Sequence, residues 1–576
     1  MPEHRSTYSF VVADSLQTIV PDVAPKPMNR QIPLTGFAGE TVAFQLAYLP
    51  PTTTTLGKVT TLGFVIGAEA APYTKVSAVD LVPCTLLAYD LHDEGYLFDK
   101  PGLYPDVLRP LATGEVVRPI IGQWRAVWIA LTVPDGLDGT LPVTVSVVAG
   151  DAGTVFTATV DVQVSSQRLP ALDIVNTHWL HFDAIAETYG FEVFSEEHWV
   201  SLEKFVEKAA FLGINSLLTP VWTPPLDTAV GATRRAVQLV GIRDEGGGYR
   251  FDFTQLERWL NVCRRAGIRH LEIAHLFTQW GAECAPQINV DTVHGLEPRF
   301  GWHTPATDPS YRRLLEALLP ALREVLDRLW GLDHVVFHIS DEPPPDKQLG
   351  YRAARAVVVD LLAGCTVIDA LSDFSYYADG DVTTPVVATD AVEPFLAAEV
   401  PDLWMYFCIG QHRRVANRFI GLPAARHRAI GTHLFLHHAA GFLHWGFNFY
   451  YTQLSTRLIS PFQDTCSGGQ FLAGEAFLVY PGESGVPLES VRAHVFMQAM
   501  SDHRAMQMLR DLAGEDAVRA IVDPSGTTTM TSFSLDPDHY LRVRAELTRE
   551  ILRRSAAATA GRSPPNTAKK PSGSRL

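Results

Sequence analysis

Two adjacent carboxylates, Asp341 and Glu342, follow directly on an apolar run at residues 335–339 and precede three prolines. A continuous apolar run of this length is typical of a strand that is covered on both faces. Burying charged groups at the end of such a strand without a purpose would be costly. The pattern therefore predicts a buried strand that delivers two acids to a cleft.

The surrounding sequence predicts a (β/α)8 barrel, an α/β fold of the TIM-like type, in which this strand is the fourth. Apolar strands alternate with amphipathic helical patterns such as residues 195–212 and 311–329. The eight expected strands lie near residues 176–182, 215–221, 269–276, 334–341, 366–371, 385–389, 402–408 and 440–446. A doubly wound open sheet is the structural alternative, but no G-x-G-x-x-G or Walker-type loop follows any strand.

Three regions are expected along the chain. Residues 1–168 hold short β-rich segments, such as 41–48, 143–148 and 157–164, and predict an N-terminal β-sandwich domain. Residues 169–555 form the barrel together with additional C-terminal helices, whose clearest patterns cover 488–509 and 539–552. Residues 556–576 contain mostly Ala, Ser, Pro and Lys, and we expect a disordered tail.

Polar and aromatic residues gather where the barrel strands are expected to end, which is where barrels hold their active sites. Aromatic rings around paired acids suit sugars, whose C–H faces stack on rings while their hydroxyls form hydrogen bonds. Plain packing is the competing explanation for any single ring. Besides Trp179 and Gln279, the residues expected to bind substrate are His178, His181, Asp183, Trp222, His275, Trp280, His303, His338, Tyr376, Tyr377, Trp404, Tyr406, Trp445 and Asn448.

The adjacency of the two acids restricts the chemistry. Neighbouring carboxylates can differ in protonation state, one acting as an acid and one ionised, as glycosidic cleavage requires. Strict strand alternation would place His338 and Glu342 on one face and Asp341 on the other, so the chain must turn at the strand end. We expect Pro343 to push Glu342 toward extended geometry and stiffen that bend. A double displacement with carboxyl groups about 5–5.5 Å apart is hard to arrange from neighbours, so the substrate is expected to supply the nucleophile.

Composition narrows the other possibilities. The net charge of −16 disfavours a nucleic-acid partner, and the chain shows neither a run of eighteen apolar residues nor a charged-then-apolar start, so no membrane partner and a cytoplasmic location are expected. Six cysteines without a C-x-x-C pair are expected to be reduced thiols. His433, His437 and His438 lie in an apolar, strand-like run without H-E-x-x-H, so we expect no metal and no cofactor. An oligomer is compatible with the sequence.

The sequence resembles glycoside hydrolase family 123 and the proteins grouped as domain of unknown function 4091. The resemblance rests on residues 338–343 (His-Ile-Ser-Asp-Glu-Pro), on 404–406 with Gly410 and Gln411, and on 441–448. It implies a sandwich followed by a barrel and an exo-acting, retaining β-N-acetylgalactosaminidase that works by substrate assistance.

The resemblance also implies roles for single residues. Asp341 would orient the 2-acetamido group, whose oxygen attacks the anomeric carbon to give an oxazolinium, and Glu342 would be the general acid and then the general base. Tyr376 or Tyr377 would hold the acetamido oxygen, while Trp404, Trp445 and Asn448 would line the sugar pocket. Two alternatives stay open, namely a glycoside hydrolase for a different sugar and a non-catalytic carbohydrate-binding barrel.

Overall fold

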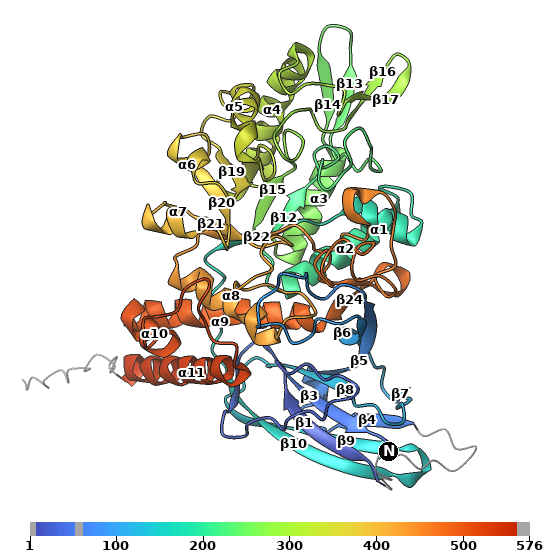
Figure 1. The fold of residues 1–576 in the computed structure, drawn as a ribbon, viewed down its shortest axis with the longest axis vertical. Helices are drawn as coiled ribbons and strands as arrows, with labels where there is room; N and C mark the ends of the chain where they lie inside the picture. Colours follow the sequence, from blue (N-terminus) through green and yellow to red (C-terminus); the bar gives the residue numbers. More distant parts are fainter. Residues whose placement is uncertain (1–6, 52–60, 561–576) are drawn as a thin grey trace, which may run out of the picture.

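The computed structural model describes residues 7–51 and 61–560, and the N-terminal part of the chain forms two facing β-sheets (Figure 1). Residues alternate along these strands: in β9 the side chains of Leu141, Val143, Val145 and Val147 are buried and their neighbours are not. The strands are β1 (Ser9–Asp14), β2 (Leu34–Phe37), β3 (Thr41–Leu49), β4 (Leu62–Ile66), β5 (Thr74–Cys84), β6 (Gly102–Pro110), β7 (Val116–Val117), β8 (Arg125–Thr132), β9 (Gly139–Ala149) and β10 (Thr154–Ser165).

One of the two sheets is completed by strands from much later in the chain. Its order is β1-β3-β8-β5-β6-β24-β23, with β23 at Tyr480–Pro481 and β24 at Pro487–Ser490, whereas the second sheet runs β2-β10-β9-β4-β7. The prediction of helix from residue 488 is therefore wrong at its start. Helix α9 begins at Val491 because the Ser490 side chain caps it, accepting a hydrogen bond from the Ala493 amide at 3.0 Å.

The predicted eight-stranded parallel barrel is confirmed. Its strands close in the order β11-β12-β15-β18-β19-β20-β21-β22, and β11 pairs with β22 through His178 and His444. Strand β18, the fourth, lies between β15 and β19, as the sequence predicts for the strand that carries the acids. The barrel strands are β11 (Val175–His178), β12 (Ser216–Thr219), β15 (His270–Ile273), β18 (Val335–His338), β19 (Thr366–Leu371), β20 (Thr384–Ala388), β21 (Trp404–Tyr406) and β22 (Gly441–His444).

Helices surround these strands (Figure 1). In α3 the buried Leu256, Trp259, Leu260 and Cys263 recur at helical spacing and face the barrel. His433 lies in helix α8 and not in a strand, so that part of the histidine interpretation is wrong. The helices of the barrel are α1 (Phe182–Tyr189), α2 (Glu196–Phe211), α3 (Thr254–Ala266), α4 (Pro309–Leu329), α5 (Gln348–Ala356), α6 (Ser375–Ala378), α7 (Glu393–Ala397) and α8 (Ala424–Leu436).

A small mixed sheet, which the sequence did not predict, projects from the end of the molecule opposite the N-terminal sheets (Figure 1). It consists of β13 (Gly241–Asp244) and β14 (Tyr249–Asp252) from the loop after β12, and β16 (Ile288–Thr292) and β17 (Gly295–Phe300) from the loop after β15. Both insertions leave the barrel where strands end, so they build up the same side of the molecule as the acids.

Three C-terminal helices pack between the barrel and the N-terminal sheets: α9 (Val491–Ala513), α10 (Glu515–Val522) and α11 (Pro537–Ala560). Helix α11 runs past residue 556, where the tail was expected to begin, and the rest of the expected tail lies outside the described residues. Within the described ranges, none of the helices combines the length and apolar character needed to cross a bilayer.

A buried ion pair joins α9 to the N-terminal sheet. The Arg492 guanidinium donates to Asp106 in β6 through Nε at 3.0 Å and Nη2 at 2.8 Å, and both side chains are at most 8% exposed. The hydroxyl of Tyr480 also donates to Asp106 Oδ2 at 2.6 Å. Within the described residues, the side chains that donate to the Asp106 carboxylate, Arg492 and Tyr480, therefore come from far later in the chain.

We predict that Arg492→Ala lowers the free energy of unfolding by about 3–5 kcal/mol, because it leaves a buried carboxylate without its cation. Denaturant unfolding would measure the loss. Arg109→Ala is the matched control, since its pair with Asp80 in the same sheet is 2.8 Å long but exposed. That variant should lose less than about 1 kcal/mol, and equal losses in the two variants would contradict the prediction.

Candidate active site

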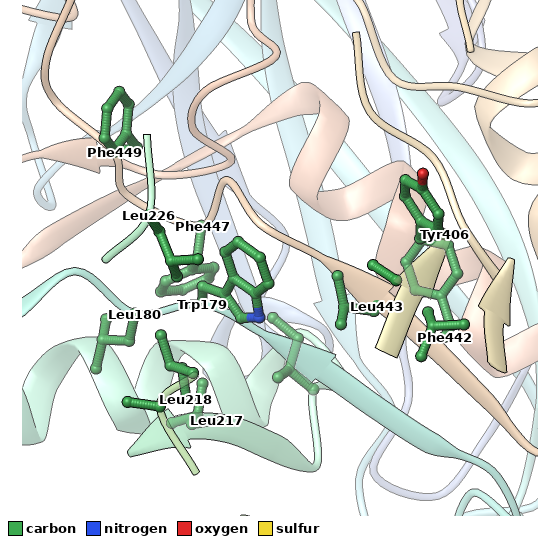
Figure 2. Packing of buried hydrophobic residues seen from close by; sticks show 14 of the residues in the cluster. Trp179, Leu180, Leu217, Leu218, Leu226, Tyr406, Phe442, Leu443, Phe447 and Phe449 are labelled. Atoms are coloured by element: carbon green, nitrogen blue, oxygen red, sulfur yellow. The ribbon is translucent and has the colours of Figure 1, made fainter. Parts of the chain in front are cut away.

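A cavity of about 140 Å³ opens at the carboxyl ends of the barrel strands. Its walls carry three acids, Asp227, Asp341 and Glu342, and the rings of Trp179, Trp280, Tyr406, Trp445 and Phe471. Figure 2 labels Trp179, Leu226, Leu443 and Tyr406 of this lining among the buried hydrophobic residues that pack around them. The cavity thus combines apolar rings with a few convergent polar groups, as ligand sites do.

The chain turns sharply between strand β18 and the prolines. The strand ends at His338, and Glu342 has a φ of 42°, in the left-handed region. The Glu342 amide donates to the Ala370 carbonyl at 3.1 Å, and the Trp280 amide donates to the Asp341 carbonyl at 2.7 Å. The extended geometry expected for Glu342 is therefore wrong, because the positive φ itself makes the bend that opens both acids onto one cavity.

The two carboxyl groups have different surroundings. Burial raises the pKa of Glu342, while hydrogen bonds from the Tyr406 hydroxyl at 2.5 Å and the Cys408 thiol at 3.8 Å to its Oε1 oppose that rise. Burial and the neighbouring Glu342 charge hold the pKa of Asp341 well above its usual range, opposed by the nearby His338. Since the charge of one acid disfavours ionisation of the other, they titrate as a pair.

Beneath the acids, His338 is clamped between two buried carboxylates. Its Nδ1 lies 3.0 Å from Glu272 Oε1 and its Nε2 lies 3.4 Å from Asp369 Oδ1. Burial alone would lower the pKa of His338, but its hydrogen bonds with Asp369 and Glu272 raise it to about 10. The two carboxylates therefore favour the protonated ring, whereas the Ala370 amide, 3.2 Å from Nε2, points its N–H at the same nitrogen.

The same clamp holds a cavity wall in place. Trp179 donates from Nε1 to Glu272 Oε1 at 2.9 Å, and Thr177 donates to Oε2 at 2.8 Å. On the other side, the Tyr351 hydroxyl donates to Asp369 Oδ2 at 2.6 Å. Trp179 Nε1 and His338 Nδ1 share the Glu272 Oε1 oxygen. The orientation of the Trp179 ring therefore depends on His338.

Glu272, His275 and His338 bring possible metal ligands within 4.8 Å of one another. The His275 ring stacks on the His338 ring with 3.8 Å between centroids, and both His338 nitrogens face carboxylates. The two ring planes are 30° apart, and both His338 nitrogens are already engaged, Nδ1 by Glu272 and Nε2 by Asp369 and the Ala370 amide. This arrangement does not fit a metal site.

Among the residues expected from the sequence to bind substrate, Trp280, Tyr406 and Trp445 line the cavity beside the two acids. Trp280 has a φ of 61° and is 42% exposed, and the Trp445 indole donates from Nε1 to Glu475 Oε1 at 2.8 Å. Glu475 is buried, and this burial raises its pKa to about 7.

The other expected residues lie around the cavity without lining it. His178 is buried against Phe442 and Phe496, Trp222 donates to the His275 carbonyl at 2.8 Å, and Trp404 packs on Gly441, where a Cβ would lie 2.1 Å from its ring. His303 is exposed. Tyr376 donates to the Pro344 carbonyl at 2.9 Å, and Tyr377 packs on Phe374 and Phe395.

His181, Asp183 and Asn448 belong to one buried network. Asp183 accepts two hydrogen bonds from Arg234, at 2.8 and 2.9 Å, and Asn448 bonds both to the amide and to the carbonyl of His181. Their contacts join the start of α1 to the loop after β22. Binding of substrate by these residues stays a prediction.

Sequence reasoning missed several cavity residues, namely Asp227, Cys408, Gln453 and Phe471, and also missed Glu475 behind Trp445. Cys408 has a signal in the sequence, because it lies two positions after Tyr406 at the end of an expected strand. The others come from long loops, and nothing in their local pattern marks them as neighbours of the acids.

This fold and this site define a barrel enzyme with a carboxylate pair at the end of its fourth strand. The family model for the glycoside hydrolase 123 catalytic domain matches residues 179–509, more than half of the chain. The chain belongs to glycoside hydrolase family 123 and is a glycoside hydrolase.

A solved structure of a family 123 enzyme has a similar fold. A family 123 glycoside hydrolase from Clostridium perfringens, described in terms of glycolipid glycan hydrolysis, aligns over 96% of this chain and 99% of its own with a TM-score of 0.71 and 13% identity. A family 5 xyloglucanase from Bacteroides ovatus aligns over 86% of this chain and 100% of its own, with 9% identity and a TM-score of 0.30, which is too low to relate the folds. No curated protein sequence matches the chain.

We predict that the free energy of unfolding of the Glu475→Gln variant, minus that of the unchanged protein, is larger at neutral pH than at pH 4.5. The folded carboxyl keeps its proton up to about pH 7, whereas the unfolded one releases it near its usual pKa. The unfolded state therefore binds fewer protons between these values, and the unchanged protein loses stability as pH rises through this window.

The variant lacks this loss, so the difference should grow by on the order of 3 kcal/mol and level off above about pH 7. Urea unfolding of both proteins across that range measures it. A difference that is the same at every pH would contradict the prediction. Gln keeps an oxygen that can accept from Trp445, so the indole should stay in place.

Proposed function

We propose that the protein is a retaining exo-glycosidase that removes a terminal β-linked 2-acetamido sugar, in particular N-acetylgalactosamine, by substrate-assisted catalysis. One observation carries the proposal: the two acids are sequence neighbours that reach one cavity through the left-handed turn at Glu342. Groups so placed approach a sugar from the same side of the site, which favours a nucleophile supplied by the substrate over an enzyme carboxylate on the opposite face.

In the first step, Asp341 accepts a hydrogen bond from the acetamido N–H and thereby polarises the group. The acetamido oxygen attacks the anomeric carbon, the glycosidic bond breaks, and Glu342 gives its proton to the leaving oxygen. The products of this step are an oxazolinium and the released aglycone. In the second step, Glu342 takes a proton from water as the water attacks the same carbon and the bond from that carbon to the acetamido oxygen breaks, which restores the configuration, the acetamido group and the acid.

The pair holds a proton that the proposed roles use. Burial raises the pKa of both acids, so a proton stays on the pair closer to neutral pH, as acid catalysis needs. In the free site the pKa of Asp341 is raised further than that of Glu342. The acetamido N–H that donates to Asp341 would favour the Asp341 carboxylate and leave the shared proton on Glu342.

The shape of the cavity supports cleavage at a chain end. Its small volume and its ring of aromatic side chains suit one sugar residue better than a run of several. The relative from Clostridium perfringens is described by its hydrolysis of glycolipid glycans. We propose a glycan terminus as the substrate of this chain too.

A second candidate is a glycosidase of different sugar specificity. The observation that favours it is that neither Tyr376 nor Tyr377, one of which would hold the acetamido oxygen, lies in the cavity lining, and Tyr376 is bound to the Pro344 carbonyl. Hydrolysis of an aryl glycoside without the acetamido group, at a rate above that of the N-acetylgalactosaminide, would favour this candidate.

We predict that Glu342→Gln lowers kcat/KM on a phenyl β-N-acetylgalactosaminide by about 10²- to 10⁴-fold, because the amide cannot give a proton to the leaving oxygen. The loss should be smaller with a dinitrophenyl leaving group, which departs without a proton. Glu316→Gln, at an exposed position on α4, is the matched control and should keep the full rate. A Glu342 variant that equals this control on both substrates would refute the assignment.

We predict that a thiazoline mimic of the oxazolinium inhibits the unchanged enzyme and that Asp341→Asn weakens this inhibition. The Asp341 carboxylate would accept a hydrogen bond from the protonated thiazoline nitrogen, and Asn offers only a neutral oxygen. Hydrogen bonds to charged groups contribute about 1.5–3 kcal/mol, so the inhibition constant should rise by at least about tenfold. An active enzyme that the thiazoline does not inhibit would rule out substrate assistance.

A further inference from the structure

A third carboxylate, Asp227, lies in the cavity wall and takes no part in the proposed chemistry. It comes from the loop between β12 and β13, where its φ of 41° is left-handed. The barrel order puts β12 beside β11 and β15, away from β21, whose Tyr406 bonds to Glu342. Asp227 and the catalytic acids are thus held by different elements around one cavity.

Asp227 is fixed by a second loop. Leu454 donates its amide to Asp227 Oδ2 at 2.9 Å, and the Ser455 hydroxyl donates to the Asp227 carbonyl at 2.6 Å. Leu454 and Ser455 also have positive φ, at 61° and 54°. Backbone of this kind is costly for residues other than glycine and persists where the surroundings hold it, most often at ligand sites.

Gln279 adds an acceptor to the same wall. Its Nε2 donates to the Thr228 carbonyl at 3.1 Å, which fixes the orientation of the amide. Its Oε1 is buried and has no hydrogen-bond partner among the described residues, although Gln279 lines the cavity and is only 4% exposed. Buried acceptors are nearly always satisfied, so one that borders a cavity is a place for a donor from a ligand.

Both groups offer acceptors to the cavity. A carboxylate has no proton to give when it is ionised, and the bond from one N–H of Gln279 to Thr228 orients the amide so that the buried Oε1 remains as an unused acceptor. Burial raises the pKa of Asp227 to about 6, a cost that a donor hydroxyl would offset. A sugar carries such donors on the carbons away from the reacting one, and an anionic substituent in the same place would be repelled.

We propose that Asp227 and Gln279 are specificity-determining residues that accept hydrogen bonds from the free hydroxyls of the terminal sugar, so that the enzyme selects a neutral sugar with unsubstituted hydroxyls. The inference rests on the proposed exo-glycosidase function. It extends that function by assigning the part of the site that reads the sugar, separate from the acids that cleave the bond.

The test compares Asp227→Asn with the unchanged enzyme on a phenyl β-N-acetylgalactosaminide and on its 3-deoxy, 4-deoxy and 6-deoxy analogues. Asn keeps an oxygen to accept from Leu454, so the loop should hold. We expect kcat/KM on the parent substrate to fall about 10- to 150-fold, the range for a hydrogen bond to a charged group. On the analogue that lacks the bound hydroxyl, the substitution should cause little further loss, since the interaction is already absent.

Asp333→Asn is the matched control, because it makes the same change at an exposed carboxylate that is not part of the cavity lining. It should leave the relative rates on the four substrates unchanged, and thermal unfolding checks that both variants are folded. An Asp227 variant that keeps the parent rate, or that loses equally on all four sugars, would overturn the inference. An unchanged enzyme that cleaves none of the four would instead overturn the proposed function.

Discussion

A buried histidine between two buried carboxylates is the interaction on which the rest of the site depends. His338 in β18 contacts Glu272 in β15 and Asp369 in β19, and Glu272 receives hydrogen bonds from Thr177 in β11 and from Trp179. Desolvating these charges is expensive, and the cost is offset only while every member keeps its partners. The network therefore fixes the register of several strands and the position of one cavity wall together.

The turn at Glu342 brings the two acids that follow this fixed strand to the cavity. Non-glycine residues with positive φ cost about 1–3 kcal/mol each, and such backbone persists only where contacts impose it. Here the contacts are the hydrogen bonds from the Glu342 amide to Ala370 and from Trp280 to Asp341, and the Tyr376 hydroxyl that braces Pro344. The strain is thus held by β19, by the loop after β15 and by α6, which keeps two neighbouring acids at one opening.

The sequence predicts the repeated strands of the barrel, but it does not predict which side chains line the cavity. All eight barrel strands and the fourth-strand acids follow from apolar periodicity and from the abrupt change at Asp341, because burial on both faces leaves a clear pattern. Trp280, Tyr406 and Trp445 also follow, since each lies at the end of a barrel strand or in the loop after one. Trp222, His178 and Trp404 have the same residue types at similar positions, yet they pack beneath the cavity, because strand position alone does not say which side chains reach the open end.

The cavity residues that the sequence did not predict come mostly from loops. Asp227 and Gln453 meet because two loops, far apart in sequence, are joined by hydrogen bonds to the backbone at Leu454 and Asp227, and such pairing leaves no periodic signal. The sequence also did not predict the inserted strands β13, β14, β16 and β17. They lie in loops between barrel elements and leave the order of strands and helices unchanged. Conversely, β24 has a helical-looking sequence and is a strand because it completes the edge of the N-terminal sheet.

The charge distribution around the cavity restricts what can bind there. Asp227, Asp341 and Glu342 open onto it, Glu475 lies behind Trp445, and burial raises the pKa of each. None of the residues described in the lining is Lys or Arg, so no cation there compensates a bound anion. Acids crowded in this way hold protons in common and repel negative groups, while hydroxyl and amide donors relieve their unmet hydrogen bonds. A neutral sugar that offers donors on every side fits this field better than an anionic ligand of the same size.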